Sequence, residues 1–404
     1  MRPPALIVLL CLMMGSATVS IGAFPALLPE LGRDAGLADW ELGTVAGAFG
    51  FARMVADIPV GLFITHHLRR ALLLSPLLVS AGVLALASGG PLPVLIGARA
   101  VMGLGHALGI VAGLTAILRY QATGRLASAL SAFELSAMLG VLGATVVVGL
   151  LPSSMPWNAA LLAACAPQLL SILTMPLVLA SLPAETRGTG RPLFARRAAG
   201  GTAAVTPAVV LAFAAGGVIA ITYATLEQFV IPLRGDREFG LSRAGIARLL
   251  MTVQLVDIAC LLPAGMLADR RGTAGVLGVM LLTFGAGTAL VAFGGFAALI
   301  VGCALFGAGM AAWTLPLSLL RAETPPEQVG WRTALYRVGV DGGIFLGPFA
   351  SGFLAGPSPW LLPGLMTALL LVIGLVLVAD QAGLTAVRGL RRGPRGPGAE
   401  GARR

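Results

Sequence analysis

The feature that most constrains this chain is a series of long apolar stretches that recurs from one end of the sequence to the other. We count about twelve of them, each roughly 18 to 27 residues long, which is the length that a helix needs to cross a lipid bilayer. They cover residues 4–28, 42–64, 71–89, 93–118, 127–151, 157–181, 206–232, 244–267, 274–293, 295–319, 333–355 and 358–379. Because a segment in lipid must satisfy its own backbone polar groups, we predict that these stretches are membrane-spanning helices.

Composition agrees with a chain that is mostly surrounded by lipid. Of its 404 residues, 57% are hydrophobic and 11% are charged, whereas a soluble domain carries about 25% charged residues. The short alternating runs that are typical of a membrane β-barrel are missing from the sequence. The predicted fold is therefore an all-α membrane protein with twelve transmembrane helices.

The basic residues indicate how the chain is oriented. Arginines gather in every second connection and in the C-terminal tail, whereas the alternate connections are neutral or mixed in charge. Positively charged loops stay in the cytoplasm, so we expect both chain ends there. The connection RGDREFGLSR, which is mixed in charge, fits this pattern least well. The first apolar stretch is too long for a cleaved signal peptide.

The net charge of +10 does not indicate a nucleic-acid partner. Basic tails beside membranes usually orient a protein or contact anionic lipid, so the bilayer is the partner that this charge predicts. The four cysteines stand singly within apolar stretches and lack CxxC spacing. They indicate neither a disulfide nor a metal site, and no cofactor is expected.

The two halves of the chain repeat one pattern. A shift of 204 residues places GLFITHHLRR, which starts at Gly61, on GMLADRRG, which starts at Gly265. The same shift matches Pro59 with Pro263, Gly103 with Gly307 and Gly36 with Gly240, and a shift of 207 matches Arg125 with Arg332 and Glu134 with Asp341. Parallel repeats of six helices place a binding site between two halves that rock against each other, which favours a transporter.

This repeat divides the chain into four segments. We expect an N-terminal six-helix bundle over residues 1–181, a cytoplasmic linker over 182–205 and a C-terminal six-helix bundle over 206–380. The remaining residues, 381–404, are rich in glycine, arginine and proline, and are predicted to form a disordered basic cytoplasmic tail.

Two motifs resemble those of the major facilitator superfamily. Gly265, Leu267, Ala268, Asp269, Arg270 and Gly272 match the GxLADRxG loop of that family, and Arg99, Gly103 and Gly105 resemble its RxxxGxG motif. The resemblance covers nearly the whole chain in helix count, loop charges and repeat position. It implies two six-helix bundles in a bacterial inner membrane, and a monomer that transports by alternating access.

The resemblance also implies a gate formed by Gly265, Asp269, Arg270 and Gly272. There the loop would hold the cytoplasmic side shut, with Asp269 docked near Arg125 at the start of the fifth helix, where free N–H groups favour negative charge. The matching loop at Gly61 carries Thr65 where the carboxylate stands in the second half, so its contact should be weaker. A turn-capping role for Asp269 is the alternative.

Ionisable residues stand well inside several predicted spans, where they are costly and tend to mark function or ion pairs. They are Arg53, Asp57, Arg99, Glu134, Glu227, Asp257, Arg337 and Asp341. Arg53 with Asp57, and Arg337 with Asp341, have i, i+4 spacing, so each pair could neutralise itself on one helix. Alternatively Asp257, which occupies the repeat position of Arg53, could attract it across the two halves as a gating contact.

By the same resemblance, the first, fourth, seventh and tenth helices line the cavity. Arg99 and His106 share one helix face, and we expect them to form its basic wall. Tyr223, Glu227, Gln228 and Trp313 would form an aromatic, mildly acidic wall. An apolar cavity favours the neutral form of a carboxyl group, so Glu227 is the first candidate for proton coupling, followed by Glu134 and Asp341. His106 and Trp313 could instead be ordinary core residues.

The predicted function is secondary transport of a small organic solute, coupled to protons, with export ahead of uptake. The fifth helix lacks the glycine-proline pattern of the drug-antiporter branch, which weakens export. Uptake of an organic anion, which Arg99 would suit, uniport, and a sensor that does not transport remain open. An enzyme is disfavoured, because no nucleophile–base or metal-ligand grouping accompanies His66, His67 and His106.

Overall fold

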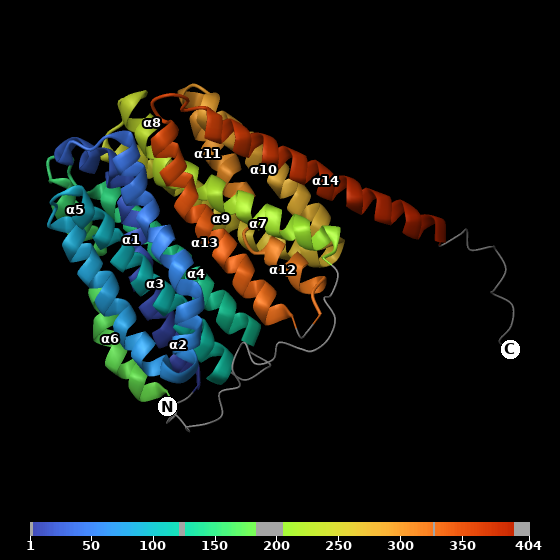
Figure 1. The fold of residues 1–404 in the computed structure, drawn as a ribbon, viewed down its shortest axis with the longest axis horizontal. Helices are drawn as coiled ribbons and strands as arrows, with labels where there is room; N and C mark the ends of the chain where they lie inside the picture. Colours follow the sequence, from blue (N-terminus) through green and yellow to red (C-terminus); the bar gives the residue numbers. More distant parts are fainter. Residues whose placement is uncertain (1–2, 121–125, 183–204, 326–327, 392–404) are drawn as a thin grey trace, which may run out of the picture.

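The structure, a computed structural model, describes residues 3–120, 126–182, 205–325 and 328–391. All of the regular structure in these residues is helical (Figure 1). The helices are α1 (Pro3–Ala35), α2 (Asp39–Ala87), α3 (Leu92–Tyr120), α4 (Leu126–Leu150), α5 (Trp157–Cys165), α6 (Gln168–Ser181), α7 (Pro207–Thr225), the π-helix η2 (Leu226–Val230), α8 (Ile231–Arg237), α9 (Arg243–Arg271), α10 (Thr273–Phe293), α11 (Phe296–Met310), α12 (Leu315–Ala322), α13 (Val329–Leu354) and α14 (Leu361–Arg391).

Ten helical segments in the described residues are long and apolar enough to cross a membrane. One of them is α2, whose 49 residues would extend about 74 Å, more than twice the thickness of a bilayer core. Helical geometry breaks at His67, where φ is −133° and ψ is 41°, and the chain turns back, because Phe49 and Val79 both lie beside neighbouring residues of α3. α2 is therefore two helices that correspond to two of the predicted stretches. α13, which carries Arg337 and Asp341, is not among the ten. Each of the twelve predicted stretches lies on one helix or on consecutive helices, and the predicted all-α membrane fold is confirmed.

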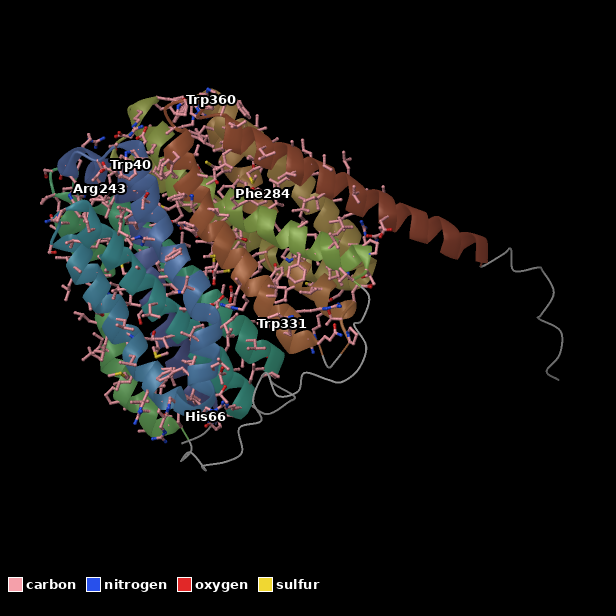
Figure 2. The ribbon with its side chains drawn as sticks, viewed as in Figure 1. Trp40, His66, Arg243, Phe284, Trp331 and Trp360 are labelled. Atoms are coloured by element: carbon pink, nitrogen blue, oxygen red, sulfur yellow. The ribbon has the colours of Figure 1, made fainter. Side chains whose placement is uncertain are left out.

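Large apolar side chains cover the outer surface of the bundle. Leu150, Leu173 and Leu262 are each at least 70% exposed, and many others project outward around the helices (Figure 2). A soluble monomer rarely exposes apolar area on this scale, so the surface fits a multi-pass membrane protein.

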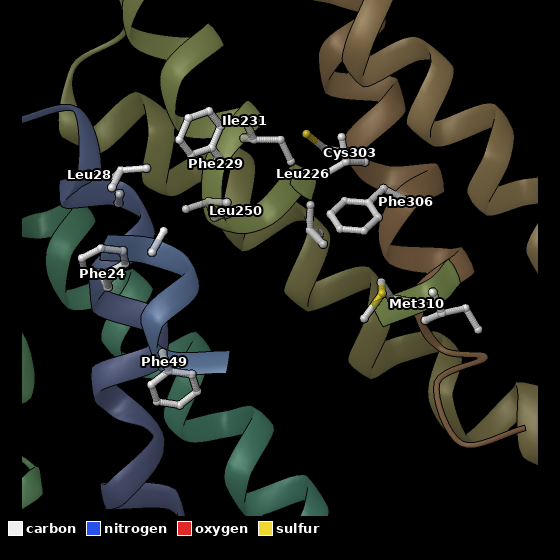
Figure 3. Close-up of a cluster of buried hydrophobic side chains, with 14 of the residues drawn as sticks. Phe24, Leu28, Phe49, Leu226, Phe229, Ile231, Leu250, Cys303, Phe306 and Met310 are labelled. Atoms are coloured by element: carbon white, nitrogen blue, oxygen red, sulfur yellow. The ribbon is translucent and has the colours of Figure 1, made fainter. Parts of the chain in front are cut away.

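Two halves lie side by side, with α1–α6 in blue to green and α7–α14 in yellow to red (Figure 1). Between them, α2 packs against α13 and α4 packs against α9. One apolar cluster of buried residues includes members of both halves. Phe24, Leu28 and Phe49 contribute from the first half, and Leu226 and Phe306 from the second (Figure 3). The halves therefore share a core in this conformation.

Glycines allow α2 and α13 to approach closely. A Cβ atom on Gly43 would overlap with the carbonyl oxygen of Pro348, and one on Gly50 would overlap with the backbone between Ile344 and Phe345. Small residues let helix backbones meet in membranes in this way. The contact therefore depends on the absence of side chains at these positions.

The substitution Gly50→Ala should lower the midpoint of thermal unfolding by several degrees in detergent, because overpacking costs about 1–3 kcal/mol. Gly97 provides the matched control, since a Cβ atom there would meet nothing within 4 Å. Gly97→Ala should leave the midpoint unchanged or raise it, because alanine favours a helix by about 1 kcal/mol over glycine. Equal midpoints for the two variants would contradict the close contact.

The two repeated motifs turn the chain at neighbouring repeat positions but with different backbone geometry. In the second half α9 ends at Arg271, and Gly272 adopts a φ of 97° before α10 begins. In the first half the shift of 204 places Leu68 at that position, where a side chain disfavours positive φ. The helix there breaks at His67 instead, without a positive φ, and the weaker latch expected at Gly61 stays a prediction. Thr65 bonds within its own helix, its hydroxyl donating to the Gly61 carbonyl at 3.0 Å.

Parts of the predicted organisation fall outside the described residues. These parts are residues 183–204 of the linker, residues 392–404 of the tail, and Arg125, the expected docking point of Asp269. α14 runs to Arg391, past the predicted boundary at residue 380. The division into segments, with its cytoplasmic linker and tail, stays a prediction.

Candidate functional site

Two ion pairs join the halves at the α2–α13 contact. Arg53 Nη2 lies 2.7 Å from Asp341 Oδ1, and Arg337 Nε lies 4.0 Å from Asp57 Oδ2. The Arg53 and Asp341 side chains are 11% and 1% exposed, so this pair is almost fully shielded from solvent. The four residues thus form a reciprocal ion-pair bridge between the two halves.

This bridge contradicts both predicted pairings of the charged residues inside the spans, the one within each helix and the one between Arg53 and Asp257. The i, i+4 pairs do not neutralise themselves, because α2 and α13 run in opposite directions and each arginine meets the acid of the other helix. The expected contact between Arg53 and Asp257 is also wrong in this conformation. Asp257 lies on α9, which packs against α4, whereas α2 packs against α13.

Four of the predicted substrate residues come together in the second half. Glu227 and Gln228 lie in the π-helix η2, and Tyr223 lies in the last turn of α7. Gln228 Nε2 donates to the Tyr223 hydroxyl at 3.4 Å. The rings of Tyr223 and Trp313 meet edge to face with centroids 5.7 Å apart. Single π-helical turns inside α-helices frequently occur at functional sites.

Gln254 is part of this group, although the sequence analysis did not select it. Its Nε2 donates to Glu227 Oε1 at 3.0 Å, and both side chains are buried. A signal for it was available. It stands three residues before Asp257, and therefore on the same face of the helix.

Acidic groups outnumber basic ones at the centre of the protein. Asp257 interacts electrostatically with Glu227 and Glu134, and Glu134 interacts with Arg53 and Arg337. With Asp57 and Asp341, the centre holds five carboxyl groups, against the guanidinium groups of Arg53, Arg337 and Arg99. Three carboxyl groups therefore have no paired arginine among the described residues.

Arg99 and His106 lie on α3 on either side of Phe49. The Arg99 guanidinium lies 3.8 Å from the Phe24 ring centroid and 5.0 Å from that of Phe49, which is a cation–π arrangement. The His106 and Phe49 rings are 5.5 Å apart. Both polar side chains are at least nine-tenths buried, so their predicted role in substrate binding stays a prediction.

A second set of ion pairs joins the halves at the end of the bundle where α9 begins. Arg33 meets Asp236 at 2.5 Å, Arg237 meets Asp39 at 2.6 Å, and Arg243 meets Glu30. We call these six residues the Arg243 lock. Arg243 lies at the end opposite His66 in Figure 2.

Arg243 is the buried member of the lock. Its side chain is 1% exposed, whereas that of Arg33 is 58% exposed. Besides Glu30, it donates to the carbonyl oxygens of Pro152 at 3.3 Å and Met155 at 2.7 Å. A cavity of about 320 Å³ beside it is lined by residues of both halves. One arginine thus binds two elements of the opposite half.

Sequence reasoning missed this lock. It counted ELGRDAGLADWE as a connection of mixed charge and RGDREFGLSR as a weak fit to the charge pattern, although Gly36 and Gly240 place them at matching repeat positions. Two connections at the same end of the bundle, each carrying both signs of charge, can pair with each other.

A family model described as the Major Facilitator Superfamily matches residues 6–236 and 208–397. The chain belongs to the major facilitator superfamily. It is therefore a membrane transporter, and the two matched ranges fall on the two repeated halves. No curated protein matches the chain by sequence.

Solved structures of other transporters share the superfamily fold. A peptide transporter POT is 16% identical, with a TM-score of 0.77 and coverage of 94% of this chain and 95% of its own. The nucleoside transporter NupG is 13% identical, with a TM-score of 0.70 and coverage of 93% and 99%. A bacterial homologue of the human lysosomal transporter Spinster, solved in an inward-facing and occupied conformation, is 13% identical, with a TM-score of 0.68 and coverage of 96% and 98%. Identities this low show the fold alone.

The superfamily motif at residues 265–272 lies at the end of α9 and in the turn after it. Asp269, Arg270 and Arg271 are exposed there, and Asp269 forms no salt bridge within the described part of the chain. Ion pairs between described residues thus join the halves at the Arg243 end and at the central bridge, and the latch at Asp269 stays a prediction.

Proposed function

We propose that this superfamily transporter exchanges protons for a small organic solute across a bacterial inner membrane and exports the solute. Described arginines at the Asp269 end include Arg69, Arg70, Arg119, Arg270, Arg271 and Arg321, which favours that end as cytoplasmic. Both chain ends then lie in the cytoplasm. The closed Arg243 lock, and an Asp269 that has no salt bridge to another described residue, fit a conformation that is open to the inside.

The surplus of central carboxyl groups is the observation that carries proton coupling. Glu227 is 4% exposed, and among the described side chains Gln254 is its hydrogen-bond partner. A carboxyl group in an apolar site accepts a proton unless a cation neutralises it. Glu227 is therefore the first candidate for the coupling site, and Glu134 and Asp341 are the next.

Competition for the same carboxyl groups favours exchange over cotransport. A solute that binds there displaces the proton, and a proton that binds there displaces the solute. The two then cross the membrane in opposite directions. An inward proton gradient would drive the solute outward.

Arg99 favours a second candidate function, which is uptake of an organic anion. Its Nε and Nη1 atoms are buried without a hydrogen-bond partner. A carboxylate or phosphate of a solute would satisfy such donors. This reading requires Phe24 and Phe49 to move away from the guanidinium.

Flux into proteoliposomes, measured for cationic drugs, organic anions and sugars with and without a pH gradient, tests the proposal. A gradient should drive accumulation of one solute class, and Glu227→Gln should reduce that gradient-driven accumulation by about tenfold or more. Glu323→Gln, at an exposed position after α12, is the matched control and should change little. Flux that is independent of the pH gradient would contradict proton coupling. Absence of flux for every solute class would favour a sensor.

A further inference from the structure

Three polar side chains in the C-terminal half form a group with too few hydrogen-bond donors. Gln254 Nε2 donates to Glu227 Oε1 at 3.0 Å. Gln254 Oε1 and Asp257 Oδ1 are buried and have no hydrogen-bond partner. Ionised carboxylates and amide oxygens only accept hydrogen bonds, so this group needs either protons on its carboxyl groups or a donor from outside it.

The three residues are positioned to act together. Gln254 and Asp257 lie three residues apart on one face of α9. From η2, Glu227 contacts Gln254 and interacts electrostatically with Asp257. The exposed fractions of Glu227 and Gln254 are 4% and 8%. Buried polar groups in native proteins are nearly always hydrogen-bonded, and the unpartnered oxygens therefore point to a ligand.

The protein supplies no cation to this group among the described residues. Glu134 on α4 and Glu227 on η2 are the charged groups that act on Asp257. Arg53 and Arg337 are paired with Asp341 and Asp57 in the central bridge.

The other helices that pack on α9 add no cation. α10 carries no charged residue, and α11 contributes the Cys303 thiol, on which the charge of Glu227 acts. The charged residues of α1 and α8 that approach α9 lie in the Arg243 lock or beside it.

An aromatic pair completes the site. Tyr223 interacts electrostatically with both Glu227 and Asp257, and its ring meets Trp313 edge to face at 5.7 Å. Aromatic faces attract organic cations, and most strongly where water is excluded. Acidic acceptors beside two rings form a site for a charged amino group that is attached to an apolar body.

We propose that Glu227, Gln254 and Asp257 bind the protonated amino group of the transported solute, with its apolar body against Tyr223 and Trp313. This rests on the transport function proposed above and adds the chemical class of the solute. The amine N–H groups supply the donors that the three acceptors lack, and its charge replaces the proton. Amine binding should therefore weaken as the pH falls from about 8 to about 6, because protons compete for the same carboxyl groups.

The test measures binding to the full-length protein in detergent at about pH 8 by titration calorimetry, with three matched probes: 4-phenylbutylamine, 4-phenylbutanol and 4-phenylbutyrate. The amine should bind at least about tenfold more tightly than the alcohol, and the carboxylate should bind most weakly. The site would be overturned if the amine did not bind, or if either analogue bound more tightly than the amine. It would also be overturned if sodium chloride displaced the bound amine as effectively as added amine hydrochloride does.

Variants locate the binding. Asp257→Asn and Gln254→Leu should each weaken amine binding by about tenfold or more, whereas Asp257→Glu should retain most of it and Glu323→Gln should leave it unchanged. Retention by Asp257→Glu also shows that the position tolerates substitution, so that loss in Asp257→Asn is not misfolding. Unchanged affinity in both weakening variants would place the amine elsewhere.

The outcome is separable from that of the proposed function. Amine binding without gradient-driven flux would remove proton-coupled export and leave the site standing. Gradient-driven flux of anions or sugars, with no amine binding, would remove the site and leave proton coupling standing.

Discussion

Exchanging the charges of the central bridge should restore transport that either single substitution abolishes. Arg53→Asp or Asp341→Arg alone should reduce flux by about a hundredfold or more, because an uncompensated charge in a buried pair costs about 3–5 kcal/mol. The double variant restores a pair of opposite charges at the 2.7 Å contact between α2 and α13. Proteoliposome flux and monodispersity in detergent are the measurements.

A second double variant separates the observed pairing from the one that the repeat suggested. Arg53→Asp combined with Asp257→Arg should not restore flux, because Asp257 lies on α9 and faces α4. Arg321→Asp, at an exposed position on α12, controls for charge reversal itself. If the Asp257 combination restores flux and the Asp341 combination does not, the bridge is assigned to the wrong partner.

Removing Arg243 should release the closed end of the transporter. Arg243→Ala leaves Glu30 without its partner and frees the carbonyl groups of Pro152 and Met155. Breaking a buried pair in this way costs about 3–5 kcal/mol, a shift of at least a hundredfold in the ratio of closed to open molecules. Spin labels at exposed Ser88 and Ser358, in a background without native cysteines, report the distance between the halves at this end.

Arg33 provides the comparison within the same lock. Its side chain is 58% exposed, and exposed ion pairs contribute about 0–1 kcal/mol. Arg33→Ala should therefore leave most molecules at the short distance, while Arg243→Ala moves most of them to a longer one. Equal distance distributions for the two variants would show that burial of Arg243 does not set the strength of the lock.

The positions of the membrane helices and the cytoplasmic end of the bundle could be predicted from the sequence, because a span must be apolar over the thickness of the bilayer and arginine-rich connections stay in the cytoplasm. The embedded charges were also found by inspection. Their partners were not, because the choice between Asp57, Asp257 and Asp341 for Arg53 depends on which helices pack and in which direction. The sequence analysis did not select Gln254 for a related reason, since a neutral amide indicates a binding site only when its neighbours in the fold are known.

One difference between the two halves was visible in the sequence but not used. Leu68 stands at the repeat position of Gly272, so the positive φ of the second-half turn is disfavoured in the first half, where the helix breaks at His67 instead. The sequence analysis considered only the missing charge at Thr65.

The two copies of the duplication use different residues to turn the chain between corresponding spans. The first copy breaks at His67, where φ is −133°, and the second breaks one repeat position later at Gly272, where φ is 97°. Only glycine adopts a positive φ without strain, so a side chain added at residue 272 would distort the second turn, whereas residue 67 accepts ordinary side chains. Sequence variation between the copies is therefore restricted more tightly at the second turn than at the first.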